Sequence, residues 1–122
     1  NNGKIIRTKR GYRLTPKGEI ELARRTFDRY QLPAQKKWDR KWRVICFDIP
    51  EKRKYVRHLI QHKLVELGFY RLQDSVFVSP QPSGEFLKLA QNAFFLRKNL
   101  RGMVIAQIDD ETELLKYFNL SR

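Results

Sequence analysis

The sequence predicts an α+β fold in which a four-stranded sheet carries two helices on one face. A nearly continuous apolar run at residues 43–49 is typical of a buried central strand. Segments 51–67 and 83–94 repeat apolar residues at helical spacing. Short strand-like runs lie at 69–72, 75–79 and 103–108. The order β-α-β-β-α-β is that of a ferredoxin-like domain. We expect antiparallel pairing except where right-handed crossovers place strands side by side.

A β-hairpin and a helix precede this domain. Residues 4–15 predict the hairpin, with Lys9-Arg10-Gly11 as its turn. Thr15 is a good N-cap and Pro16 suits the first helical position, so the helix begins there and ends before Pro33.

The polar segment 33–40 predicts a boundary. We expect a basic hairpin-plus-helix arm with its linker at residues 1–40, and a ferredoxin-like dimerisation domain at residues 41–122. The first part holds twelve Lys and Arg against four Asp and Glu, a net charge of +8. The remainder holds fourteen against nine, a net charge of +5. The smaller part has the denser charge, so we expect it to touch phosphate first.

The domain elements have predictable ends. The first helix should place an apolar stripe on the core and its basic residues, Lys63 among them, toward solvent. Gly68 should end it. Ser83 should cap the second helix, Arg101-Gly102 should turn into the last strand, and Asp109 or Asp110 should cap a short final helix.

The sheet's second face also needs cover. Val76, Val78 and the apolar side of the last strand are too hydrophobic for open water. A homodimer across this face is the expected solution.

The amino-acid composition limits the kinds of binding partner to expect. A net charge of +13 on 122 residues attracts polyanions, and nucleic acid is the leading partner. An anionic membrane surface and an incidentally basic surface are the weaker alternatives. No apolar run approaches the roughly 20 residues of a membrane span. Cys46 cannot form an internal disulfide, and we expect a buried, inert thiol in a reducing cytoplasm.

Basic residues interleaved with aromatic residues predict the nucleic-acid contacts. Tyr12 either stacks on a base or fills the strand. The candidate phosphate ligands, with the hairpin residues first, are Arg7, Lys9, Arg10, Arg13, Lys36, Lys37, Arg40, Arg53, Lys54 and Arg57.

Two blocks of sequence suggest a family. WRVICFDIPEKRK followed by LGFYRLQDSVFVSP resembles the central domain of the phenylacetate-operon repressor (PaaX-like) family. That domain is similar to the small CRISPR-associated adaptation protein, a ferredoxin-like dimer that partners the spacer integrase. GYRLTPKG resembles the wing and following helix of a winged helix-turn-helix. The helices before a wing and a C-terminal helical domain are missing, so we expect either a fragment or a protein without a complete reading head.

Asp48 follows the first domain strand. The resemblance implies a Mg²⁺ ligand and catalytic acid there, with two copies facing across a dimer. The alternative, which we favour, is that Asp48 caps the next helix or pairs with an arginine. His58 and His62, four residues apart, make half a zinc site at most, and we expect two surface histidines.

Three functional hypotheses follow. The leading one is a non-catalytic homodimer that binds double-stranded DNA as a transcriptional regulator, without a cofactor. The alternative is a Mg²⁺-dependent endonuclease, or a CRISPR adaptation subunit with an integrase partner, acting through Asp48. A protein-interaction domain with incidental charge is a third reading.

Overall fold

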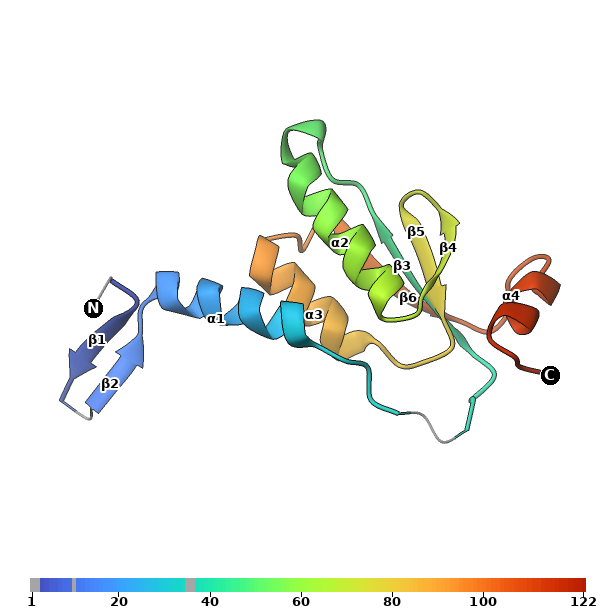
Figure 1. Ribbon diagram of the computed structural model, residues 1–122, viewed down its shortest axis with the longest axis horizontal. Helices are drawn as coiled ribbons and strands as arrows, with labels where there is room; N and C mark the ends of the chain where they lie inside the picture. Colours follow the sequence, from blue (N-terminus) through green and yellow to red (C-terminus); the bar gives the residue numbers. More distant parts are fainter. Residues whose placement is uncertain (1–2, 10, 35–36) are drawn as a thin grey trace.

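The computed structural model describes residues 3–9, 11–34 and 37–122. A hairpin, β1 (Ile5–Thr8) and β2 (Gly11–Leu14), leads into helix α1 (Pro16–Arg29). The domain then runs β3 (Trp42–Phe47), a 3-10 turn η1 (Glu51–Arg53), α2 (Lys54–Glu66), β4 (Tyr70–Gln73), β5 (Val76–Ser79), α3 (Gly84–Phe94), β6 (Leu100–Ile105) and α4 (Thr112–Tyr117). The predicted α+β order is confirmed (Figure 1).

The domain sheet has the strand order β4-β5-β3-β6, and every pairing in it is antiparallel. This is consistent with a ferredoxin-like core. The expectation of parallel neighbours is wrong for a topological reason. Each βαβ unit is split: β5 lies between β3 and β4, and β3 lies between β5 and β6. The parallel members of each unit therefore never share hydrogen bonds.

The last strand begins earlier than the sequence suggested. Arg101 and Gly102 lie inside β6, because its register with β3 runs from Phe47↔Leu100 to Trp42↔Ile105. A Cβ atom at Gly102 would lie 2.6 Å from Leu87 Cδ2, so glycine here lets α3 pack close to the strand. This glycine marks a close helix–strand approach, and the predicted turn is wrong.

The predicted helix ends are partly correct. Gly68, with φ +91°, follows the end of α2, as expected. Ser83 is the N-cap residue of α3, but its side chain makes no capping hydrogen bond. Glu111, and neither Asp109 nor Asp110, is the N-cap residue of α4.

The main core lies between the sheet and helices α1, α2 and α3 (Figure 1). Ile45 and Phe47 of β3 contribute to it. Helix α1 joins this core through Phe27, whose ring centroid lies 5.6 Å from that of Phe86 and 5.0 Å from that of Phe94. The C-terminal half of α1 thus shares the domain's core, while the division at residue 40 stays a prediction.

The second face of the sheet is covered by the chain itself. Trp42, Val44 and Val78 are buried there against Leu114 of α4. This corrects the reason for expecting a dimer, because α4 already shields Val78 from water. Met103 of β6, the cross-strand partner of Val44, remains exposed on this face, and its neighbour Val104 is exposed on the opposite face. Cys46 is half-buried, less covered than expected. The homodimer itself stays a prediction.

A polar cluster fastens α4 to the start of β3. Glu111 accepts hydrogen bonds from Trp42 Nε1 at 3.0 Å and from Arg122 Nε at 2.7 Å. Arg122 also donates to the carbonyl of Arg40 and lies 5.1 Å from the centroid of the Trp38 ring. The rings of Trp38 and Trp42 also contact each other, with their centroids 4.9 Å apart.

Acid should loosen this cluster. Hydrogen bonds from Arg122 and then Trp42 lower the pKa of Glu111 from 4.5 to about 2. A carboxylate with a depressed folded-state pKa stabilises the protein above its unfolded pKa, and the stabilisation is lost as pH falls toward the folded value. At pH 6 we expect the parent to have a higher melting temperature than Glu111→Gln. The two melting temperatures should converge as the pH falls from 4.5 to 2.

Asp109→Asn, at an exposed acid in the preceding loop, is the control and should track the parent throughout. A difference in melting temperature between the parent and Glu111→Gln that does not change with pH would contradict this account.

Candidate nucleic-acid interface

The β1–β2 hairpin projects from the domain at the far end of α1 (Figure 1). Its register places Arg7 opposite Tyr12 and Ile6 opposite Arg13. Cross-strand partners share a face and neighbours alternate, so Arg7 and Arg13 lie on opposite faces. Both are exposed, as is Lys9 at the turn. Tyr12 is 73% exposed, so it does not fill a core, and the structure keeps it open for stacking.

The hairpin is docked on the first turn of α1. Thr15 Oγ1 accepts a bond from the Gly18 amide at 3.2 Å, which confirms the predicted N-cap, and donates to the Gly3 carbonyl at 2.6 Å. The Thr15 amide donates to the Lys4 carbonyl at 2.7 Å. Lys4 forms an ion pair with Glu21. This ion pair, through its hydrogen bond, lowers the pKa of Glu21.

Helix α1 extends the basic surface. Its exposed bases are Lys17, Arg24, Arg25 and Arg29, of which Arg25 forms an ion pair with Glu21 at 3.1 Å. Lys17 and Arg24, seven residues apart, share one line along the helix, and Arg25 and Arg29 share a second. The sequence-based prediction of phosphate contacts did not include these four residues, although their helical spacing is visible in the sequence. We call the exposed bases of the hairpin and of α1 the basic arm: Arg7, Lys9, Arg13, Lys17, Arg24, Arg25 and Arg29.

The connector contributes two exposed bases, Lys37 and Arg40. The predicted contacts Arg10 and Lys36 lie outside the described residues. Just beyond the connector, Arg43 holds Asp39 with two hydrogen bonds of 2.8 and 2.5 Å, and this lowers the pKa of Asp39 to about 2. The negative charge of Asp39 is therefore compensated by the guanidinium of Arg43.

Two of the three bases predicted near α2 have partners within the fold. Arg53 Nη2 donates to the Phe94 carbonyl at the end of α3, at 2.7 Å. Arg57 pairs with Glu51 at 3.2 Å. Lys54 is exposed. Figure 1 shows the start of α2 well away from the hairpin, so the structure does not bring these residues together with the basic arm.

Asp48 is exposed at the end of β3. Its amide donates to the Asn99 carbonyl at 2.8 Å, and Asn99 Nδ2 donates to its carbonyl at 2.9 Å. Two hollows flank it. One, of about 420 Å³, includes Arg57, His58, Arg71 and Asp74, and the other, of about 260 Å³, includes Lys98, Asn99 and Arg101.

The surroundings of Asp48 do not by themselves fit Mg²⁺. The nearby carboxylate of Asp74 is bound by Arg71 at 3.1 Å, and most other charges in the two hollows are cations. In the described residues no three His, Cys, Asp or Glu side chains gather as metal ligands. His58 and His62 are both exposed. A metal site at Asp48 stays a prediction that needs a second carboxylate from elsewhere.

The predicted capping role of Asp48 is wrong. Pro50 is the N-cap residue of η1, Arg53 is that of α2, and neither helix has a side-chain capping bond. The chain turns away from Asp48 at Pro50, so the carboxylate is left at the surface.

The described helices lack the length and hydrophobicity that a membrane crossing requires. Comparison with curated proteins and with solved structures gave no significant match. Comparison with known families gave one: residues 35–111 match the family described as the PaaX protein central Cas2-like domain. This segment spans β3 to β6, the sheet and helices that place Asp48, whereas the hairpin and α1, which hold the basic arm, lie before it. On this match, and as its two sequence blocks suggested, the chain belongs to the PaaX family through its central Cas2-like domain.

Proposed function

We propose that this chain is the DNA-binding and dimerising part of a transcriptional repressor. PaaX proteins are transcriptional repressors. The observation that carries the proposal is the hairpin, which projects from the far end of α1 (Figure 1) and whose Arg7, Lys9 and Arg13 are exposed. Lys and Arg side chains on such a projection can reach phosphates without steric hindrance from the core.

The basic arm suits the backbone of double-stranded DNA. Arg7 and Arg13 point from opposite faces of the hairpin, so a hairpin lying along a groove presents a cation to each bounding strand. The bases of α1 continue the same positive surface toward the domain. A dimer would present two such arms, and the exposed β6 residues Met103 and Val104 leave apolar surface for that association.

A salt titration tests the proposal. If six or more phosphates are contacted, log K should fall with log salt at a slope of about −5 or steeper. Replacement of Arg7, Lys9 and Arg13 by alanine should make the slope shallower by about 3, since each lost phosphate contact removes about 0.9. Binding to duplex DNA is measured by fluorescence anisotropy at several salt concentrations.

The matched control replaces Lys52, Lys88 and Lys116, three exposed lysines of the domain, by alanine. It removes the same charge and should keep the parent's slope. Equal slopes for the hairpin variant and the control would overturn the proposed role of the hairpin. Mg²⁺-dependent cleavage of the DNA that is lost in Asp48→Ala would instead support the nuclease hypothesis.

A further inference from the structure

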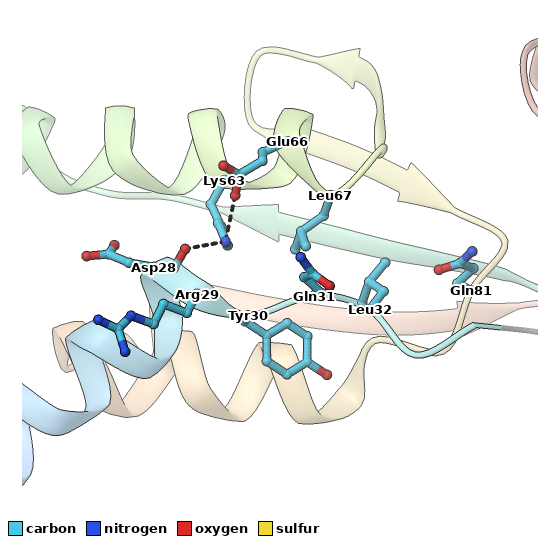
Figure 2. A pocket seen from close by; sticks show the side chains of 9 residues that line it. All are labelled: Asp28, Arg29, Tyr30, Gln31, Leu32, Lys63, Glu66, Leu67 and Gln81. Atoms are coloured by element: carbon cyan, nitrogen blue, oxygen red, sulfur yellow. Dashed lines mark hydrogen bonds and ion pairs between the residues drawn. The ribbon is translucent and has the colours of Figure 1, made fainter.

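Lys63 is a buried charge at the contact between α1 and α2. It is 6% exposed, although its place in the sequence predicted a solvent-facing base. Figure 2 shows its side chain reaching from α2 toward the end of α1. Its Nζ donates to the Asp28 carbonyl at 2.8 Å and to Glu66 Oε2 at 2.6 Å.

The acceptor on α1 is a backbone group that needs a partner. Asp28 lies in the last turn of a helix that ends at Arg29. The final carbonyls of a helix have no intrahelical donors, and a cation there interacts favourably with the helix dipole. Burial of an ammonium group is unfavourable unless it is paired and hydrogen-bonded. The ammonium group of Lys63 therefore gains an acceptor, and the Asp28 carbonyl at the end of α1 gains a donor.

Two hollows border this bond. A hollow of about 640 Å³, which includes Gln31, Leu67 and Gln81, lies on one side of Lys63 (Figure 2). A second hollow of about 360 Å³, which includes Leu59 and His62, also borders it. Helix α1 is packed on α3 through Phe27, whereas between the two hollows it reaches α2 through Lys63.

We propose that Lys63 is a positioning residue that fixes the direction of α1 and, with it, of the hairpin. Helix α1 has 14 residues, so at about 1.5 Å per residue it is about 20 Å long, and the hairpin adds roughly 13 Å. A tilt of about 10° at the end held by Lys63 would move the hairpin turn by roughly 6 Å, more than the spacing of about 3.4 Å between base pairs. The direction of α1 thus decides which phosphates the basic arm can reach. Only this last consequence rests on the proposed function.

Distances between spin labels test the proposal without DNA. Labels are attached at Tyr12→Cys in the hairpin and His58→Cys on α2, both exposed sites, in a Cys46→Ala background. We expect one narrow distance distribution in this parent. Lys63→Met, which keeps the length of the side chain and removes its donors, should shift or broaden the distribution by about 5 Å. Lys63→Arg should restore the parent's distribution, because its guanidinium can donate to the same carbonyl.

Lys88→Met, at an exposed lysine of α3, is the matched control and should leave the distribution unchanged. A narrow, unshifted distribution in Lys63→Met would overturn the proposal. If that variant does not fold, Lys63→Gln takes its place, since its amide is polar but too short to reach Asp28. DNA affinity is measured separately, and Lys63→Met should weaken it more than Lys88→Met. If the parent itself fails to bind DNA, the proposed function fails while the distances still decide the role of Lys63.

Discussion

Replacement of Phe27 by alanine should lower the free energy of unfolding by about 3–5 kcal/mol. The Phe27 ring is 1% exposed and contacts Phe86 and Phe94, so its removal leaves a cavity where α1 meets α3. Urea unfolding followed by circular dichroism measures the change. A loss of this size would show that α1 and the domain unfold as one cooperative unit, because the cavity lies between them.

Leu22→Ala on the same helix is the control for this substitution. Leu22 is largely exposed, and its truncation should cost no more than about 0.5 kcal/mol. If Phe27→Ala also cost less than about 1 kcal/mol, α1 would not be part of the cooperative core.

Replacement of Gly18 by alanine should undock the hairpin and leave the domain folded. A Cβ atom at Gly18 would collide with the backbone carbonyl of Lys4. The same carbonyl accepts the Thr15 amide, so it cannot move away without loss of that bond. Alanine favours a helix over glycine by about 1 kcal/mol, which means that any loss must come from the collision. The largest effect should therefore fall on the hairpin.

Amide hydrogen exchange of Ile5–Leu14 measures this undocking, and protection there should fall while that of β3 and β5 stays. DNA affinity should drop to that of the Arg7, Lys9 and Arg13 triple variant if the hairpin must be held in place to bind. Gly84→Ala is the control, since a Cβ atom there meets no other atom within 4 Å. Unchanged protection of the hairpin in Gly18→Ala would show that Lys4 has room to adjust.

The two substitutions separate two ways in which the basic arm is held. Phe27 attaches α1 to the domain by apolar packing. Gly18 and Thr15 attach the hairpin to α1 by close backbone approach and hydrogen bonds. If both attachments are rigid, the domain sets the position of the hairpin, and a change in the domain changes that position.

The central features of the fold follow from local patterns. The apolar run of β3 predicted a buried central strand, and Val44 and Ile45 indeed enter different cores. Thr15-Pro16 located the start of α1, and Gly68 located the end of α2. These signals are contained within a few neighbouring residues, because caps, turns and strand alternation depend on local geometry.

The candidate interface was predictable only in part. The charge of the hairpin could be read directly, but Arg53 and Arg57 read equally well as contacts until their partners at Phe94 and Glu51 were known. A basic residue has the same appearance in a sequence whether it faces phosphate or closes the end of a helix. Its partner can lie far along the chain, as Phe94 lies 41 residues from Arg53.

The sequence by itself determined the order of strands and helices, the concentration of positive charge before residue 40, and the two blocks that indicate the family. Only the tertiary structure decided that α4 covers Val78, that β6 begins at Leu100, and that Lys63 is buried. The physical reason is that burial belongs to a contact between distant segments. Asp28 is 35 residues from Lys63, and its carbonyl becomes a partner only when α1 is laid against the domain.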